Sequence, residues 1–188
     1  MKKLIVMLLL LSGLFNSNIF AQEKYGKTLN LGLGLGGYSG YYKYSGRTLP
    51  VFNINYEFDV AKNFTLAPFV SFFTFSNNYY WGNKNHPERY YSYRATVIPI
   101  GVKGAYYFDE LFKANTKWDF YAAGSLGFAI VNAQWEGGYE GDKDYYHGPN
   151  SVLIDLHFGA EYHFNSRVGA FLDLSTGVST IGLAIHGK

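Results

Sequence analysis

A strict two-residue alternation of apolar and polar side chains is the feature of this sequence that most restricts its fold. It is clearest in the stretch IDLHFGAEYHF, residues 154–164, where every even position is apolar or aromatic. The odd positions hold Asp155, His157, Gly159, Glu161 and His163. Successive side chains of a β-strand point to opposite faces, so the pattern predicts a strand between two different environments.

The same alternation recurs along the chain and predicts eight strands. They cover residues 28–42, 49–58, 64–76, 91–108, 118–132, 154–164, 167–175 and 180–186. The connections at 59–63 and 165–166 are short, and those at 39–48, 77–90 and 133–150 are longer. Even strand number, with turns at one end and loops at the other, is typical of outer-membrane barrels. We therefore predict an all-β fold: an eight-stranded antiparallel up-and-down transmembrane β-barrel.

The first 21 residues have the pattern of a cleavable signal peptide. Lys2 and Lys3 form a basic start, residues 4–11 are apolar, and Ala21 precedes the predicted cleavage point. The apolar run is shorter than the roughly 20 residues that a transmembrane helix needs. Residues 22–188 are then the outer-membrane β-barrel domain. The chain has no Cys, which excludes a lipid anchor on Cys, disulfides and thiolate chemistry.

The charge and composition argue against a nucleic-acid partner. Loss of Lys2 and Lys3 with the signal peptide takes the formal net charge of +2 to zero. No basic face for nucleic acid is then expected. Aromatic residues make up 20% of the chain and there are 22 Gly. This composition suits a β-sheet protein in an apolar setting.

The alternation alone also fits a secreted soluble barrel that binds a small apolar ligand inside. Two observations favour the membrane barrel, with the apolar row outward. Charged residues of the strands fall almost entirely on the polar row, with Arg94 as the exception. That row otherwise consists mainly of Gly, Ala, Ser and Asn, which suits the filled interior of a small barrel better than a solvated surface.

The polar row therefore predicts a network of polar side chains inside the lumen, where buried charges must be paired. Its predicted members are Glu57, Lys103, Asp155, His157, Glu161, His163 and Asp173. Aromatic residues near the strand ends predict two interfacial girdles in contact with outer-membrane lipid. The girdle residues are Tyr79, Tyr80, Trp81, Tyr106, Phe108, Trp118, Tyr162 and Phe164.

One predicted strand carries a family resemblance. The stretch VIPIGVKGAYYF, residues 97–108, resembles a strand of the small eight-stranded outer-membrane β-barrel domain family, the porin-like, OmpA- and OmpX-like barrels. LGLGLGGY, residues 31–38, looks like the family's first strand. The resemblance implies a monomer in the Gram-negative cell envelope, inserted by the barrel assembly machinery. The chain departs from the family in ending on Ile185-His186-Gly187-Lys188 instead of an aromatic residue.

The spacing of the polar row argues against one catalytic set. Asp155 and His163 are separated by about 26 Å along a strand, nearly the height of a membrane. Some eight-stranded barrels are lipid-modifying enzymes, but these need Ser, His and an acid where lipid can reach them. His157 and His163 are predicted to point inward, and the pattern identifies no Ser beside them. It also offers no clustered ligands for a metal at either His.

These considerations predict a non-enzymatic protein of the bacterial outer membrane, with no cofactor and no metal. Its lumen is filled, so it is not a diffusion porin. Its role is structural or lies in interaction with an extracellular partner through the loops at 39–48, 77–90 and 133–150. A lipid-modifying enzyme and the soluble ligand-binding barrel remain as alternatives.

Overall fold

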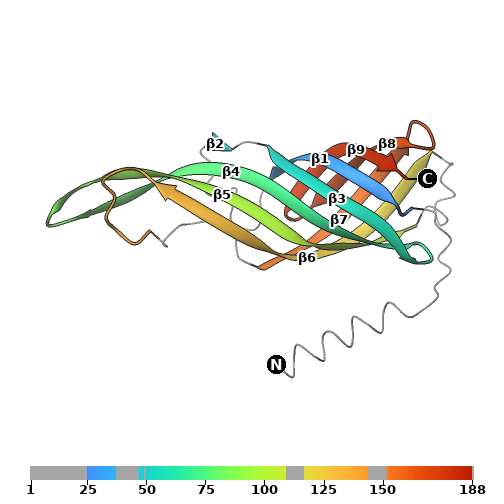
Figure 1. The fold of residues 1–188 in the computed structure, drawn as a ribbon, viewed down its shortest axis with the longest axis horizontal. Coiled ribbons are helices and arrows are strands. Elements are labelled where there is room, and N and C mark those ends of the chain that lie inside the picture. The colour runs from blue at the N-terminus through green and yellow to red at the C-terminus, as the bar shows by residue number, and fades with distance from the viewer. Residues whose placement is uncertain (1–24, 37–46, 49, 109–116, 144–151, 188) are drawn as a thin grey trace, which may run out of the picture.

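The computed structural model describes residues 25–36, 47–48, 50–108, 117–143 and 152–187. Within these ranges the chain forms strands joined by turns, as Figure 1 shows. The strands are β1 (Thr28–Gly36), β2 (Arg47–Thr48), β3 (Val51–Ala61), β4 (Phe64–Asn83), β5 (His86–Tyr107), β6 (Trp118–Trp135), β7 (Val152–His163), β8 (Val168–Ser175) and β9 (Val178–His186). Each of the eight predicted strands is present.

The strands close into a barrel. Each long strand pairs antiparallel with the long strands that precede and follow it in sequence. The two-residue β2 adds a short antiparallel pairing to β4. The ring is closed by β1 and β9, whose register runs from Thr28 opposite His186 to Gly36 opposite Val178. The predicted fold, an eight-stranded up-and-down antiparallel β-barrel, is confirmed. The β1–β9 pairing closes the sheet, so the eight long strands that the structure describes each have a partner on both sides over at least part of their length.

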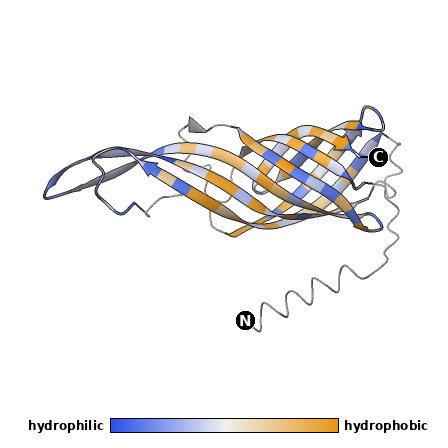
Figure 2. Ribbon diagram, in the orientation of Figure 1, coloured by the Kyte–Doolittle hydropathy of each residue, from blue (hydrophilic) through white to orange (hydrophobic). Residues whose placement is uncertain are grey.

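The outer wall of the barrel is apolar. Side chains of the predicted apolar row are exposed on it, among them Leu126 at 61%, Leu156 at 69% and Ile154 at 74%. Figure 2 shows many hydrophobic residues, in orange, along the barrel strands, and hydrophilic residues, in blue, at the turns and at the far end of the β4–β5 hairpin. A contiguous apolar surface around a whole molecule is far larger than the patches of soluble monomers.

The interior is filled by the opposite row. Buried polar and charged side chains all come from it: Thr28, Asn30, Asn55, Glu57, Thr65, Ser71, Lys103, Ser125, Asp155, Glu161, Asp173 and Thr180. Glycines let strands approach where larger residues cannot fit. At the Gly101–Gly127 cross-strand pair, a Cβ on Gly127 would lie 2.5 Å from the Ile100 carbonyl oxygen. The small residues that predicted a narrow lumen therefore occupy its wall.

The prediction of a long loop over residues 77–90 is wrong. β4 and β5 continue past the other strands as a paired hairpin, which projects from one end of the barrel (Figure 1). At its turn, the Asn83 side-chain oxygen accepts hydrogen bonds from the backbone N–H of Asn85 at 2.8 Å and His86 at 3.0 Å. A side chain that bonds the backbone two residues on is a turn device, and it fixes the hairpin tip.

Other predictions fall on residues that the structure does not describe. The signal peptide, the start of the first loop at 39–46 and residues 144–150 of the third lie outside the described ranges. The described start of the third connection extends β6 to Trp135. Among the described residues there is no helix long and apolar enough to cross a membrane.

Candidate functional site: polar clusters in the lumen and an aromatic hairpin

The polar lumen residues form three separate clusters instead of one continuous chain. The central cluster surrounds Asp173 on β8. Its carboxylate accepts hydrogen bonds from Lys103 Nζ at 3.0 Å and Tyr121 Oη at 2.8 Å. His157 Nδ1 lies 2.7 Å from the other carboxylate oxygen. One buried anion thus joins β5, β6, β7 and β8, and all its oxygens are satisfied.

A serine lies beside this cluster, which the sequence pattern did not identify. Ser125 Oγ lies 2.9 Å from His157 Nε2. Ser125 on β6 pairs directly with Asp155 on β7, and His157 is the next inward-facing residue of β7 after Asp155. Ser125, His157 and Asp173 are therefore hydrogen-bonded in the order of a nucleophilic triad. The prediction that no Ser neighbours the inward histidines is wrong.

The space beside Ser125 decides what this arrangement can accommodate. A cavity of about 40 Å³ adjoins it, lined by side chains that include Asn55, Ser71, Lys103 and Asp155. Each buried water needs roughly 10–15 Å³, so there is room for about three waters. This volume is small compared with that of a lipid acyl chain. Asp155 borders the same space, and its carboxylate accepts a hydrogen bond from Thr176 Oγ1 at 3.3 Å.

The second cluster surrounds Glu57 on β3, nearer the end of the barrel where β1 begins. Its carboxylate accepts hydrogen bonds from Tyr107 Oη at 2.6 Å, from Asn30 Nδ2 at 3.3 Å and from Thr65 Oγ1. Tyr25 stacks on Tyr107 with ring centroids 4.0 Å apart, and both rings are buried. Every acceptor of this buried carboxylate is thus matched by a neutral donor.

The third cluster lies at the same end, on β7 and β9. Glu161 Oε1 is 2.7 Å from His186 Nε2 and 3.7 Å from His163 Nδ1. His163 Nε2 lies 2.6 Å from Asp119 Oδ2, and His186 Nδ1 lies 2.9 Å from Thr28 Oγ1. Ligand atoms of Glu161, His163 and His186 all lie within 4.8 Å of one another. The prediction that His163 lacks clustered metal ligands is therefore wrong.

The predicted girdle residues divide between two faces. Tyr106, Trp118 and Phe164 are exposed on the outer wall at the end of the barrel that carries the turn at residues 62–63. Trp118 packs against Tyr162 with ring centroids 4.9 Å apart, and Phe108 lies against Phe158 at 5.6 Å. The Trp118–Tyr162 contact lies at that end, whereas Phe108 reaches from it to Phe158, near the middle of β7.

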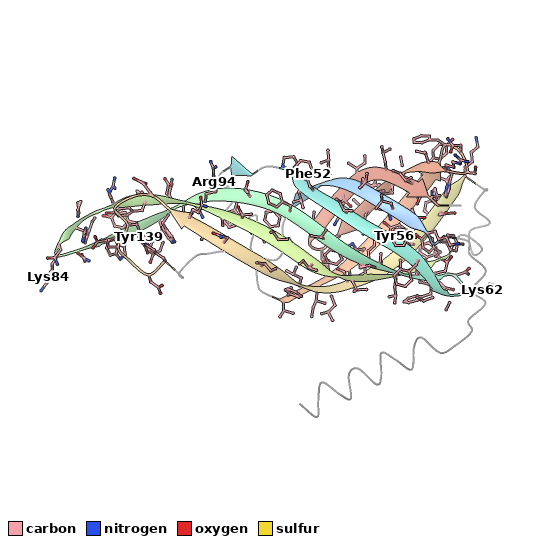
Figure 3. All side chains as sticks on the ribbon, in the orientation of Figure 1. Phe52, Tyr56, Lys62, Lys84, Arg94 and Tyr139 are labelled. Carbon is pink, nitrogen blue, oxygen red and sulfur yellow. The ribbon has the colours of Figure 1, made fainter. Side chains whose placement is uncertain are left out.

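At the other end, only Tyr80 of the three predicted girdle residues faces outward. Tyr79 and Trp81 lie on the opposite face of the hairpin, where both contact Tyr139, so they do not belong to an outer girdle. Tyr139, labelled in Figure 3, is buried among these rings, and its hydroxyl donates to the Asp142 carbonyl at 3.1 Å. This burial raises the pKa of the Tyr139 phenol. The segment after β6 thus packs onto the hairpin and stiffens it.

Two side-chain contacts to Glu residues also join that segment to the hairpin. Arg89 lies 3.4 Å from Glu136, and His86 lies 3.0 Å from Glu140. On the outward face, Tyr80 and Tyr90 form an edge-to-face pair with ring centroids 5.1 Å apart. They are 53% and 67% exposed. A braced hairpin that presents two exposed aromatic rings is a surface suited to binding.

Comparison with known proteins adds little to this geometry. None of the known protein families matches the sequence, and no curated protein is similar to it at a significant level. Among solved structures, the chain is similar to the outer membrane protein Ail of Yersinia pestis, whose backbone structure was determined in a phospholipid bilayer nanodisc. The identity is 11% and the TM-score 0.38, over 84% of this chain and 96% of that one.

Proposed function

We propose that this protein is a monomeric integral β-barrel of the Gram-negative outer membrane, with a filled lumen and a surface-interaction role. The observation that carries the proposal is the pairing of an apolar outer wall with a polar, hydrogen-bonded interior. A barrel with this arrangement is stable in lipid, because its backbone is satisfied internally and its exposed side chains are apolar. Outer-membrane lipid and the barrel assembly machinery are its expected partners.

The orientation follows from the lengths of the connections. Bacterial outer-membrane barrels place short turns in the periplasm and longer excursions outside the cell. The turn at residues 62–63, the start of β1 and the end of β9 lie at one end, and the β4–β5 hairpin projects from the other (Figure 1). Arg94, labelled in Figure 3, is exposed on the outward row where β5 leaves the barrel for the hairpin. The hairpin is therefore the extracellular element.

The interaction role rests on Tyr80 and Tyr90, because exposed aromatic side chains on a rigid support are frequent centres of binding energy. In a Tyr80→Ser/Tyr90→Ser variant, the retention of expressing cells on surfaces coated with proteins or polysaccharides is expected to fall strongly. A loss of at least about 2 kcal/mol, roughly 30-fold in affinity, is typical of such sites.

The matched control is Lys84→Ala, which changes the exposed hairpin tip without removing a ring. It is expected to leave retention unchanged. Barrel integrity in each variant is checked by its heat-dependent migration on gels. Equal retention by the parent and the double variant, with both barrels folded, would contradict the interaction role.

The Ser125–His157–Asp173 geometry favours a second candidate, a hydrolase of a small ester. Ser125 would take the acyl group while the alcohol leaves with the proton held by His157, and water would then release the acid and restore Ser125. The cavity of about 40 Å³ and its lumen position oppose a lipid substrate. We favour the structural role, in which the serine completes the hydrogen bonding of His157.

A fluorophosphonate probe that reacts with activated serines separates the two. The folded protein is expected to remain unlabelled, as is its Ser125→Ala variant. Labelling of the parent that is lost in Ser125→Ala, with Ser71→Ala as the matched control that retains it, would establish the enzyme instead. Ser71 lines the same cavity but has no contact with His157 among the described hydrogen bonds.

A further inference from the structure

We infer that the third lumen cluster is a binding site for a divalent transition-metal ion of the zinc class. Its ligands are Glu161, His163 through Nδ1 and His186 through Nε2. The inference goes beyond the proposed function, and it rests on side-chain geometry at the end of the barrel opposite the hairpin. A mixed set of imidazole and carboxylate donors suits Zn²⁺ and its neighbours better than Ca²⁺ or Mg²⁺.

In each histidine, the ring nitrogen that points away from Glu161 already has a hydrogen-bond partner. His163 Nε2 is held by Asp119 Oδ2 at 2.6 Å. Metal-binding histidines usually donate their second N–H to a carboxylate or another oxygen in this way, which fixes the ring and its tautomer. The same arrangement appears at His186, whose Nδ1 contacts Thr28 Oγ1 at 2.9 Å.

The contact with Thr28 bears on the position of the His186 proton. The single hydrogen of Thr28 Oγ1 can go to the Tyr25 carbonyl, 2.9 Å away, and Oγ1 then accepts from His186 Nδ1–H. In the neutral ring, Nε2 then directs its lone pair at the Glu161 carboxylate, 2.7 Å away. Two electron-rich atoms at that distance need a cation between or on them. A proton or a metal ion supplies it.

A metal ion, unlike a proton, can be shared by the third donor that converges on the same point. Donor atoms around a tetrahedral zinc, with bonds of about 2.0–2.2 Å, lie roughly 3.3–3.5 Å apart. The three donors of the cluster already lie within 4.8 Å of one another. Side-chain adjustments of about 1–1.5 Å bring them to that geometry.

The backbone around the site is fixed and leaves room for Glu161. The His163 N–H donates to the Lys117 carbonyl at 2.8 Å, and the His186 N–H donates to the Arg167 carbonyl at 2.9 Å. Position 169 faces the carboxylate from β8, and a Cβ there would lie 3.1 Å from Glu161 Cδ. Gly169 therefore makes space for the ligand. A metal ion would link β7 and β9 across β8.

The ion can reach this site from outside the barrel. The side chains of His163 and His186 are 22% and 15% exposed, so the cluster opens towards the end of the barrel where β9 finishes. Three protein ligands leave a further coordination position for water. The carboxyl groups of Glu161 and Asp119 both lie at the site, which also favours a cation.

The test uses tag-free, full-length mature protein folded in detergent micelles and titrated with Co²⁺ and Zn²⁺. One metal per chain is expected, with visible absorption bands of protein-bound Co²⁺ that Zn²⁺ displaces. His163→Gln and His186→Gln are each expected to abolish this stoichiometric binding. Asp119→Asn is expected to weaken it by roughly 10–100-fold, the range for an outer-shell partner. His86→Gln, a histidine of the hairpin, is the matched control and should bind like the parent.

A second measurement covers variants that lose stability. Zn²⁺ binding to the folded state alone raises the unfolding temperature, so the parent should gain stability with added Zn²⁺ and His186→Gln should not. Heat-dependent gel migration shows whether each variant is folded. Absence of one-to-one binding by the folded parent would overturn the inference, and so would equal binding by the His186→Gln and His86→Gln proteins.

Discussion

Replacement of Asp173 by Ala is expected to destabilise the barrel by roughly 3–5 kcal/mol, the usual cost of removing one partner from a buried ion pair. Lys103, with 10% of its side chain exposed, would lose the carboxylate that lies 3.0 Å from its Nζ. Tyr121 and His157 would lose their acceptor as well. The measurement is urea-induced unfolding in lipid vesicles, followed by tryptophan fluorescence.

Two comparison variants separate the ion pair from the rest of the cluster. Ser125→Ala removes one neutral hydrogen bond and is expected to cost only about 0.5–1.5 kcal/mol. The double variant Lys103→Met/Asp173→Ala is expected to be more stable than Asp173→Ala alone, because no unpaired charge remains. A free energy of unfolding for Asp173→Ala within about 0.5 kcal/mol of the parent, a change typical of surface substitutions, would contradict this account of the lumen.

The second large effect is expected on the outer wall. Phe158 on β7 is 56% exposed among apolar neighbours. Phe158→Arg is expected to cost about 2–4 kcal/mol in a bilayer, the range for Arg near the midplane of a barrel. Phe158→Leu is the matched control and should cost less than about 1.5 kcal/mol. Both are measured by unfolding in vesicles.

Gly159, the next residue, faces the lumen, so a substitution there tests the packing inside the barrel. A Cβ on Gly159 would lie 2.6 Å from Tyr121 Cε1, so Gly159→Arg is expected to prevent folding by overfilling the lumen. The two Arg variants therefore fail for different reasons, and only Phe158→Arg should depend on lipid. A Phe158→Arg protein as stable as the parent, and soluble without detergent, would favour the soluble barrel.

The strands and their faces were predictable because both depend on local alternation. The apolar row at residues 154, 156 and 158 lies outside, and the polar row at residues 155, 157 and 159 lies inside. The hairpin had a signal that was missed: strand-forming aromatic residues at 79–81, 90, 91 and 93 flank a turn that holds Asn83 and Asn85. A polar turn between two strand-like segments predicts a hairpin.

The contacts inside the lumen were not predictable in the same way. His163 and His186 come together because β7 and β9 flank β8 at a particular register, and their rings lie 4.9 Å apart. Ser125 meets His157 for the same reason. Register and barrel stagger depend on how each strand pairs with its neighbours. The alternation within one strand therefore predicts which side chains face the lumen, but not which side chains of the neighbouring strands lie at the same height.

The most direct test of a membrane-spanning barrel uses the absence of native Cys. Lys84 at the hairpin tip and Lys62 at the opposite turn are both exposed, and Figure 3 places them at the two ends of the molecule. Each is replaced by Cys, and intact cells are treated with a maleimide that does not cross membranes. Lys84→Cys is expected to react in intact cells, and Lys62→Cys only after the outer membrane is permeabilised. Equal labelling of both variants in intact cells, or their recovery in the soluble fraction without detergent, would contradict the account.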